Sequence, residues 1–69
     1  MSAARLFDYL INKHNLKNDA ELSKVTGMGG SFVSRARNGK LPVGDVRILA
    51  IHDVFDMPIK EIKGFLNEA

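Results

Sequence analysis

Apolar residues recur at helical spacing at both ends of this 69-residue chain. Near the N-terminus they predict a helix that Ser2 can cap and that runs to about Lys13 or His14. The apolar stripe of this helix consists of Ala3, Leu6, Phe7 and Leu10. Toward the C-terminus, Pro58 suits the start of another helix. The inward stripe of that last helix consists of Ile59, Ile62 and Leu66.

Residues 18–40 are the stretch around which the chain is organised, because they read as two short helices joined by a tight turn. Asn18 is a good N-cap for the first helix, and the Glu21 carboxylate can reach back to the backbone N–H of that cap. Gly27 can adopt the left-handed conformation that ends a helix, so we expect the chain to turn there. We interpret Met28 as a core residue that plugs this turn.

The second helix of this stretch is predicted over residues 30–38, with its end at Gly39. Val33 and Ala36 lie three residues apart and are expected to face inward. The opposite face is polar and cationic, and it contains Ser31, Ser34, Arg35 and Asn38. A short helix, a glycine turn and a second helix with such a face suit the major groove of DNA.

A further helix, from Pro42 or Val43 to about Phe55, is predicted to be apolar on two sides. One side consists of Val43, Val46, Leu49, Ala50 and Val54, and the other of Ile48, Ile51 and Phe55. A helix that is apolar on both sides is normally buried between layers, so we expect this one at the centre of the domain. The pattern as a whole predicts an all-α, compact five-helix domain without a sheet.

Composition limits the class of protein further. Sixty-nine residues make a single domain, residues 1–69, near the lower end of what folds unaided. The absence of cysteine excludes disulfides and thiolate metal sites, and we expect a cytoplasmic protein without a metal or cofactor. No apolar run reaches the roughly 18 residues that span a bilayer, and the N-terminus lacks the apolar core of a signal peptide.

The net charge is +2, and it is distributed unevenly. Residues 24–47 carry five lysines and arginines against a single aspartate, whereas residues 48–69 carry two lysines against four carboxylates. The excess positive charge therefore lies on the helix–turn–helix stretch and just after it. This distribution is expected of a polyanion-binding surface, although a solvated charged face would give the same count.

The order of residues in this stretch resembles the helix-turn-helix of the phage Cro and repressor class, a lambda repressor-like or XRE-like domain. In that pattern a leucine and then a small residue precede the turn glycine, a β-branched residue follows it, and an Asn-Gly pair closes the second helix. Here those positions hold Leu22, Ser23, Gly27, Val33, Asn38 and Gly39. The resemblance extends from Leu6 to about Leu66, which is most of the chain.

The resemblance implies a sequence-specific, double-stranded DNA-binding transcriptional regulator whose second motif helix lies in the major groove. Arg35 is the strongest candidate for reading a base, because a guanidinium can make a bidentate contact to guanine. Ser31 and Arg35 match family positions that face base edges, and we add Ser34 to this base-reading set. Asn38 and Lys40 match the family's phosphate-contacting stretch, and we add Lys24, Gly29, Gly30 and Arg37 to this phosphate-contacting set.

Some positions depart from the family pattern. The family often has glutamine at the first position of each motif helix, where this chain has Asp19 and Gly30. It often has glutamate at the position of Arg37, paired with an arginine of the first helix. Arg37 cannot form that pair, so either its partner has changed sign, with Asp8 as one candidate, or it contacts phosphate.

These departures keep a second function open, that of a protein-interaction module such as an antitoxin or an anti-repressor-like partner with the same fold. An enzyme is the weakest hypothesis. The chain has no cysteine, no paired carboxylates at an evident pocket and no His–Glu metal spacing, and a domain of this size rarely encloses a substrate cavity.

A single recognition helix reads only a few base pairs, so useful specificity normally needs two copies about 34 Å apart. We therefore expect a weak two-fold homodimer. Its surface is predicted mainly on the last helix, which belongs to the acidic C-terminal part of the chain, away from the DNA-binding stretch. The residues assigned to this interface are Ile51, Phe55, Gly64 and Phe65.

Overall fold

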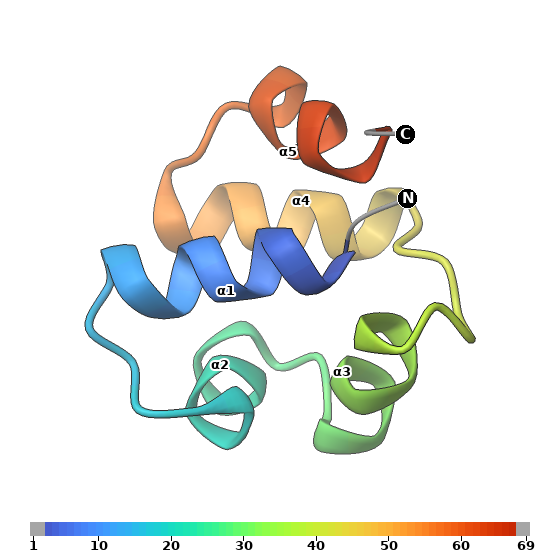
Figure 1. Ribbon diagram of the computed structural model, residues 1–69. Coiled ribbons are helices and arrows are strands. Elements are labelled where there is room, and N and C mark those ends of the chain that lie inside the picture. Colours follow the sequence, from blue (N-terminus) through green and yellow to red (C-terminus); the bar gives the residue numbers. More distant parts are fainter. Residues whose placement is uncertain (1–2, 68–69) are drawn as a thin grey trace.

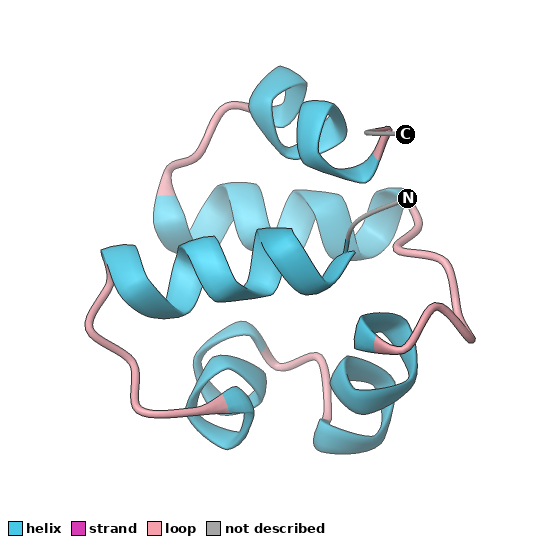
Figure 2. Ribbon diagram, in the orientation of Figure 1, coloured by secondary structure: helices cyan, strands magenta, loops and turns pink. Residues whose placement is uncertain are grey.

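The computed structural model describes residues 3–67, so the proposed cap Ser2 lies outside the described residues. Within this range the chain forms five α-helices and no strand, which confirms the expected all-α class (Figure 2). The helices are α1 (Ala3–Lys13), α2 (Asp19–Thr26), α3 (Gly30–Arg37), α4 (Asp45–Phe55) and α5 (Ile59–Leu66). None of them is long and apolar enough to cross a membrane.

The helices surround one hydrophobic core. In Figure 1, α1 and α4 run across the middle of the view, with α5 above them and α2 and α3 below. The helix α5 packs against both α1 and α4, whereas α2 packs against α1, α3 and α4. The side chains with no exposed surface are Leu6, Phe7, Leu10, Leu22, Val33, Ile51 and Ile62. All five helices therefore contribute to the same core, and α2 and α3 form one layer against it.

The start and end of α2 follow from local hydrogen bonds. The Asn18 side chain accepts a hydrogen bond from the Glu21 N–H at 3.0 Å, which confirms Asn18 as the N-cap. The Glu21 carboxylate accepts from the N–H of Lys17 at 2.9 Å, one residue before the donor we expected. Gly27 ends the helix in the left-handed region with φ 72°, and its N–H donates to the Ser23 carbonyl.

The helix α4 differs from the sequence-based prediction in its start and in its environment. It begins at Asp45, after an extended Gly44, so Pro42 and Val43 belong to the preceding loop. The side of Ile48 and Ile51 is buried, whereas the side of Val46, Leu49 and Val54 is exposed by 76%, 49% and 45%. The helix α4 does contact both α2 and α5, as its expected central place requires. The expectation that both of its apolar sides are buried is wrong, because only the side of Ile48 and Ile51 faces the core.

Candidate nucleic-acid interface

The helix α3 packs against the core through two small buried residues. Val33 is fully buried and Ala36 is 2% exposed, which confirms that these two residues face inward. Met28, only 7% exposed, fills the turn between α2 and α3 as expected. Phe32 and Arg37 on its flanks are half-buried, and the remaining surface of α3 is directed to solvent.

The solvent-facing side of α3 is polar and cationic. The residues predicted to read bases are Ser31, Ser34 and Arg35, and all three are exposed. Asn38 is exposed at the end of the same helix, and its side-chain amide donates to the Ser34 carbonyl at 2.9 Å. The structure thus places these four residues on one outer surface, which we call the α3 face. Their side chains offer hydroxyl, amide and guanidinium groups to a ligand.

The C-terminal end of α3 is closed by two backbone hydrogen bonds. The Gly39 N–H donates to the Ala36 carbonyl at 3.1 Å, and the Lys40 N–H donates to the Arg35 carbonyl at 2.8 Å. This pair of bonds is the Schellman arrangement, which needs a left-handed residue such as Gly39 with φ 76°. It holds the backbone of Lys40 directly after α3, with the side chain exposed.

The N-terminal end of α3 has an open backbone. Gly29 precedes the helix with φ 83°, and no side chain caps the helix there. Both Gly29 and Gly30 are exposed, and a Cβ atom at either position would meet no atom within 4 Å. The start of α3 thus has free space around both glycines.

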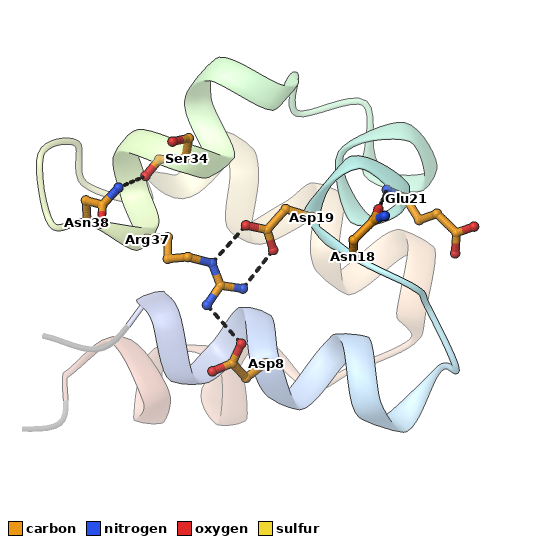
Figure 3. A network of polar contacts seen from close by, with 7 residues as sticks. All are labelled: Asp8, Asn18, Asp19, Glu21, Ser34, Arg37 and Asn38. Atoms are coloured by element: carbon orange, nitrogen blue, oxygen red, sulfur yellow. Dashed lines mark hydrogen bonds and ion pairs between the residues drawn. The ribbon is translucent and has the colours of Figure 1, made fainter.

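Arg37 lies at the centre of an ion-pair network between three helices (Figure 3). Its Nε and Nη2 donate to both carboxylate oxygens of Asp19 on α2, at 2.9 and 2.7 Å. Its Nη1 donates to Asp8 on α1 at 2.8 Å. The two hydrogen bonds to Asp19, and after them the one to Asp8, raise the pKa of Arg37 above its usual value, although partial burial opposes the rise. This network ties α3 to α1 and α2.

The network corrects one assigned role. We assigned Arg37 to the phosphate-contacting set, but all three of its guanidinium nitrogens donate to carboxylates within the fold. Arg37 is therefore better described as a residue that positions α3. Asp8, the candidate partner of changed sign, makes one of these contacts. The sequence-based reasoning did not identify Asp19 as the second partner, which lies 18 residues before Arg37 in the chain.

A second contact braces α3 from α4, and sequence reasoning missed it. The guanidinium carbon of Arg47 lies 4.0 Å from the ring centroid of Phe32, within the range of a cation–π interaction. Arg47 is half-buried, and its Nε is buried without a hydrogen-bond partner. The two residues are fifteen positions apart on different helices, so no local pattern could have linked them. Phe32, which is partly buried against the core, is consequently a support of the α3 face.

Three cations of residues 24–47 have exposed side chains: Lys24 on α2, Arg35 on α3 and Lys40 just after α3. Arg37 and Arg47, the remaining cations of residues 24–47, make contacts within the fold. Asp19, at the start of α2, is paired with Arg37. The acidic residue that would most directly repel a polyanion is therefore neutralised by its own neighbour.

The residues assigned to a dimer interface lie in different environments. Ile51 has no exposed surface, so its assignment to an intermolecular contact is wrong. Phe55 is half-buried and stacks on His14, with ring centroids 4.3 Å apart. Phe65 is half-buried against Tyr9 at 5.1 Å. Gly64 is exposed, and no atom lies within 4 Å of the position its Cβ would take.

Other kinds of site find little support among residues 3–67. No group of three histidine, cysteine or carboxylate residues could hold a metal ion there. Two open hollows of about 320 and 220 Å³ lie between α4 and α5, and both are lined in part by Ile48 and Lys63. Neither is lined by a residue of the α3 face.

Comparisons of the chain with protein families, with curated proteins and with solved structures found no match. Any function proposed for this fold consequently rests on its own residues and their geometry.

Proposed function

We propose that this protein is a sequence-specific, double-stranded DNA-binding protein that acts as a small cytoplasmic transcriptional regulator. In this proposal α3 enters the major groove and α2 crosses the DNA backbone, as in the Cro and repressor class that the sequence resembles. The role is one of binding rather than catalysis, and it needs no cofactor.

One observation carries the proposal: α3 presents a wholly polar and cationic face on a helix that follows a glycine turn. The side chains of Ser31, Ser34 and Arg35 are exposed together, and an α-helix is of the size that the major groove admits. Arg35 would read a guanine through O6 and N7. The two serines are short enough to let the helix approach the base edges closely.

The surroundings of α3 support phosphate contacts on both sides of it. Lys24 and Lys40 would each pair with a phosphate, and Asn38 would add a neutral contact. The backbone N–H groups at Gly29 and Gly30 would meet another phosphate at the start of α3, where the helix dipole favours negative charge. Contacts of this kind position a protein on DNA without reading its sequence.

The proposal is tested by selecting duplexes from a random pool with the purified chain and sequencing those retained. We expect an enriched motif with two half-sites separated by about one DNA turn. The Arg35→Ala variant, selected in parallel, should lose the preference at one base pair of each half-site. If no sequence is enriched and no duplex is bound at low salt, the chain is not a DNA-binding protein of this kind.

A protein-interaction module remains the alternative function, and the exposed apolar side of α4 is the observation that favours it. In that case the chain would bind a protein through α4 without measurable affinity for DNA. Salt-dependent binding to duplex DNA separates the two functions, because only the first requires release of counterions from phosphates.

A further inference from the structure

The outer side of α4 carries an apolar stripe that the fold leaves largely exposed. Four large apolar side chains are exposed among the described residues, and three of them lie on this one helix. They are Val46, Leu49 and Val54, and the half-buried Ala50 lies among them. We call these four residues the α4 stripe. Exposed apolar patches of this kind mark contact sites for other molecules.

We propose that the α4 stripe is the homodimer surface of this protein and that two copies of α4 pair antiparallel across it. The dimer surface is inferred from the chain alone, and only its use on DNA depends on the proposed function. This inference replaces the assignment of the interface to Ile51 and to the side of α5 that carries Phe65.

The order of residues in the stripe is what points to a second copy as the partner. Val46 and Val54 each lie four residues from Ala50. A two-fold axis passing beside Ala50 therefore places Val46 of each copy opposite Val54 of the other, which gives two equivalent contacts. The same surface is then complementary to itself, which a two-fold interface requires. The small side chain of Ala50 at the axis lets the two helices approach closely.

Charges at the edge of the stripe agree with this pairing. Asp53 lies on the same outer side of α4, and it is exposed. In the antiparallel register it comes opposite the first turn of α4 in the other copy. Lys63 of α5 lines a hollow beside that first turn, together with Asp45 and Leu49. Asp53 of one copy thus lies on the side where the other copy carries Lys63 beside Asp45, so that the lysine offsets one of the two carboxylates there.

The direction of α4 also suits two DNA-binding units. In Figure 1, α4 runs across the view with α2 and α3 below it. A two-fold axis perpendicular to α4 and directed toward the layer of α2 and α3 keeps both α3 helices on the same side of the dimer. The domain measures 27 × 25 × 20 Å, so equivalent points of two adjacent copies lie at distances of the order of one DNA turn, about 34 Å.

The size of the stripe sets the strength of the dimer. An 11-residue helix is about 16 Å long, and its outer side is about 10 Å wide. This area is well below the roughly 800 Å² that each partner buries in a standard stable interface. The dimer should therefore be weak, with a dissociation constant of about 0.1–1 mM in the absence of DNA.

Cysteine cross-linking tests the proposed register directly, because the chain has no cysteine of its own. Facing Cα atoms of two helices packed about 8–10 Å apart are roughly 4–5 Å from each other, which is within reach of a disulfide. Without DNA, Ala50→Cys should form a disulfide dimer on mild oxidation. The matched control Val25→Cys, at an exposed valine of α2, should remain largely monomeric.

A mixture of Val46→Cys and Val54→Cys chains distinguishes antiparallel from parallel pairing. We expect the mixed disulfide to exceed both symmetric ones at least fivefold. Statistical pairing, or equal cross-linking of the Ala50→Cys and Val25→Cys chains, would overturn the proposal.

A measurement without cross-links provides the second test. In sedimentation equilibrium without DNA, Val54→Lys should weaken dimerisation at least tenfold, whereas the control Val25→Lys should leave it unchanged. Both positions are exposed, so the helical circular dichroism of the two variants should equal that of the parent. A parent that stays monomeric at 1 mM, or a dimer that Val54→Lys does not weaken, would show that the stripe is not the dimer surface. Neither result would bear on DNA binding, because DNA is absent.

Discussion

The outer faces of α3 and α4 are both exposed to solvent, yet their side chains have opposite chemistry. The α3 face offers hydroxyl, amide and guanidinium groups, and the α4 stripe offers valine, leucine and alanine side chains. Water solvates the first kind of surface well and the second poorly. Exposure by itself therefore does not tell what a helix contacts. The chemistry of the exposed side chains points to a polyanion for α3 and to an apolar partner for α4.

The two helices are also held in place by different forces. Each helix has two buried side chains, but those of α4 are the larger Ile48 and Ile51, whereas those of α3 are Val33 and Ala36. Polar contacts complete the attachment of α3, through the ion pairs of Arg37 and the stacking of Arg47 on Phe32. A face that must remain polar on the outside is thus supported from behind by directional contacts.

The largest effect is expected from removing the proposed base contact. Arg35→Ala should cost about 1–3 kcal/mol per half-site on the selected DNA sequence and much less on random DNA. Leu49→Ala on the α4 stripe should leave the affinity for an isolated half-site unchanged. Fluorescence anisotropy with a selected and a random duplex measures both. If Arg35→Ala lost the same binding free energy on both duplexes, Arg35 would contact phosphate and would not read a base.

The polar attachment of α3 is tested by a comparison of two arginines on one helix. Arg37→Ala should lower the free energy of unfolding by about 1–2 kcal/mol, because it removes a partly exposed bidentate ion pair. Arg35→Ala should change it by less than about 0.5 kcal/mol, because its side chain is exposed. Urea denaturation followed by circular dichroism gives both values. Equal stability of the two variants would mean that the network does not hold α3.

The turn between α2 and α3 should tolerate a side chain less well than the loop before α4. Gly27→Ala is expected to cost about 1 kcal/mol of stability, because φ is 72° at this position. Gly44→Ala should be neutral or slightly stabilising, because φ is −84° there and a Cβ would meet no atom within 4 Å. Thermal melting compares the two, and a Gly44→Ala protein that melts below Gly27→Ala would contradict this account of the turn.

The smallest effect concerns a single phosphate contact. If Lys24 and Lys40 of each protomer release about one counterion each, a dimer should show a log–log salt slope of about −3.6. Lys40→Ala should reduce the magnitude of that slope by about one for each protomer and weaken all sequences alike. Lys60→Ala on α5 is the matched control and should leave the slope unchanged. If the slope of Lys40→Ala equalled that of the parent, Lys40 would not contact a phosphate.

Features that depend on neighbours in the chain could be predicted from the sequence. The cap at Asn18 and the helix ends at Gly27 and Gly39 all involve residues within a few positions of each other. The inward direction of Val33 and Ala36 likewise follows from helical spacing alone. These local signals were sufficient to place the α3 face.

Features that depend on distant partners could not be predicted in the same way. Arg37 binds Asp19, 18 residues away, and only the packing of α2 against α3 shows that they meet. The helix α4 has apolar residues on two sides, so its pattern does not tell which side faces the core. The positions of α2 and α5 decide this in favour of the side that contains Ile48.

The contrast between the two faces is tested most directly by NMR titration of the protein with a short duplex at low salt. Binding through α3 predicts shifts of the backbone amide signals of Ser31, Ser34, Arg35 and Lys40. The amides of Val46, Leu49 and Val54 should not shift when the duplex carries one half-site. Shifts on the α4 stripe with an unchanged α3, or no shift anywhere, would contradict the assignment of DNA binding to the α3 face.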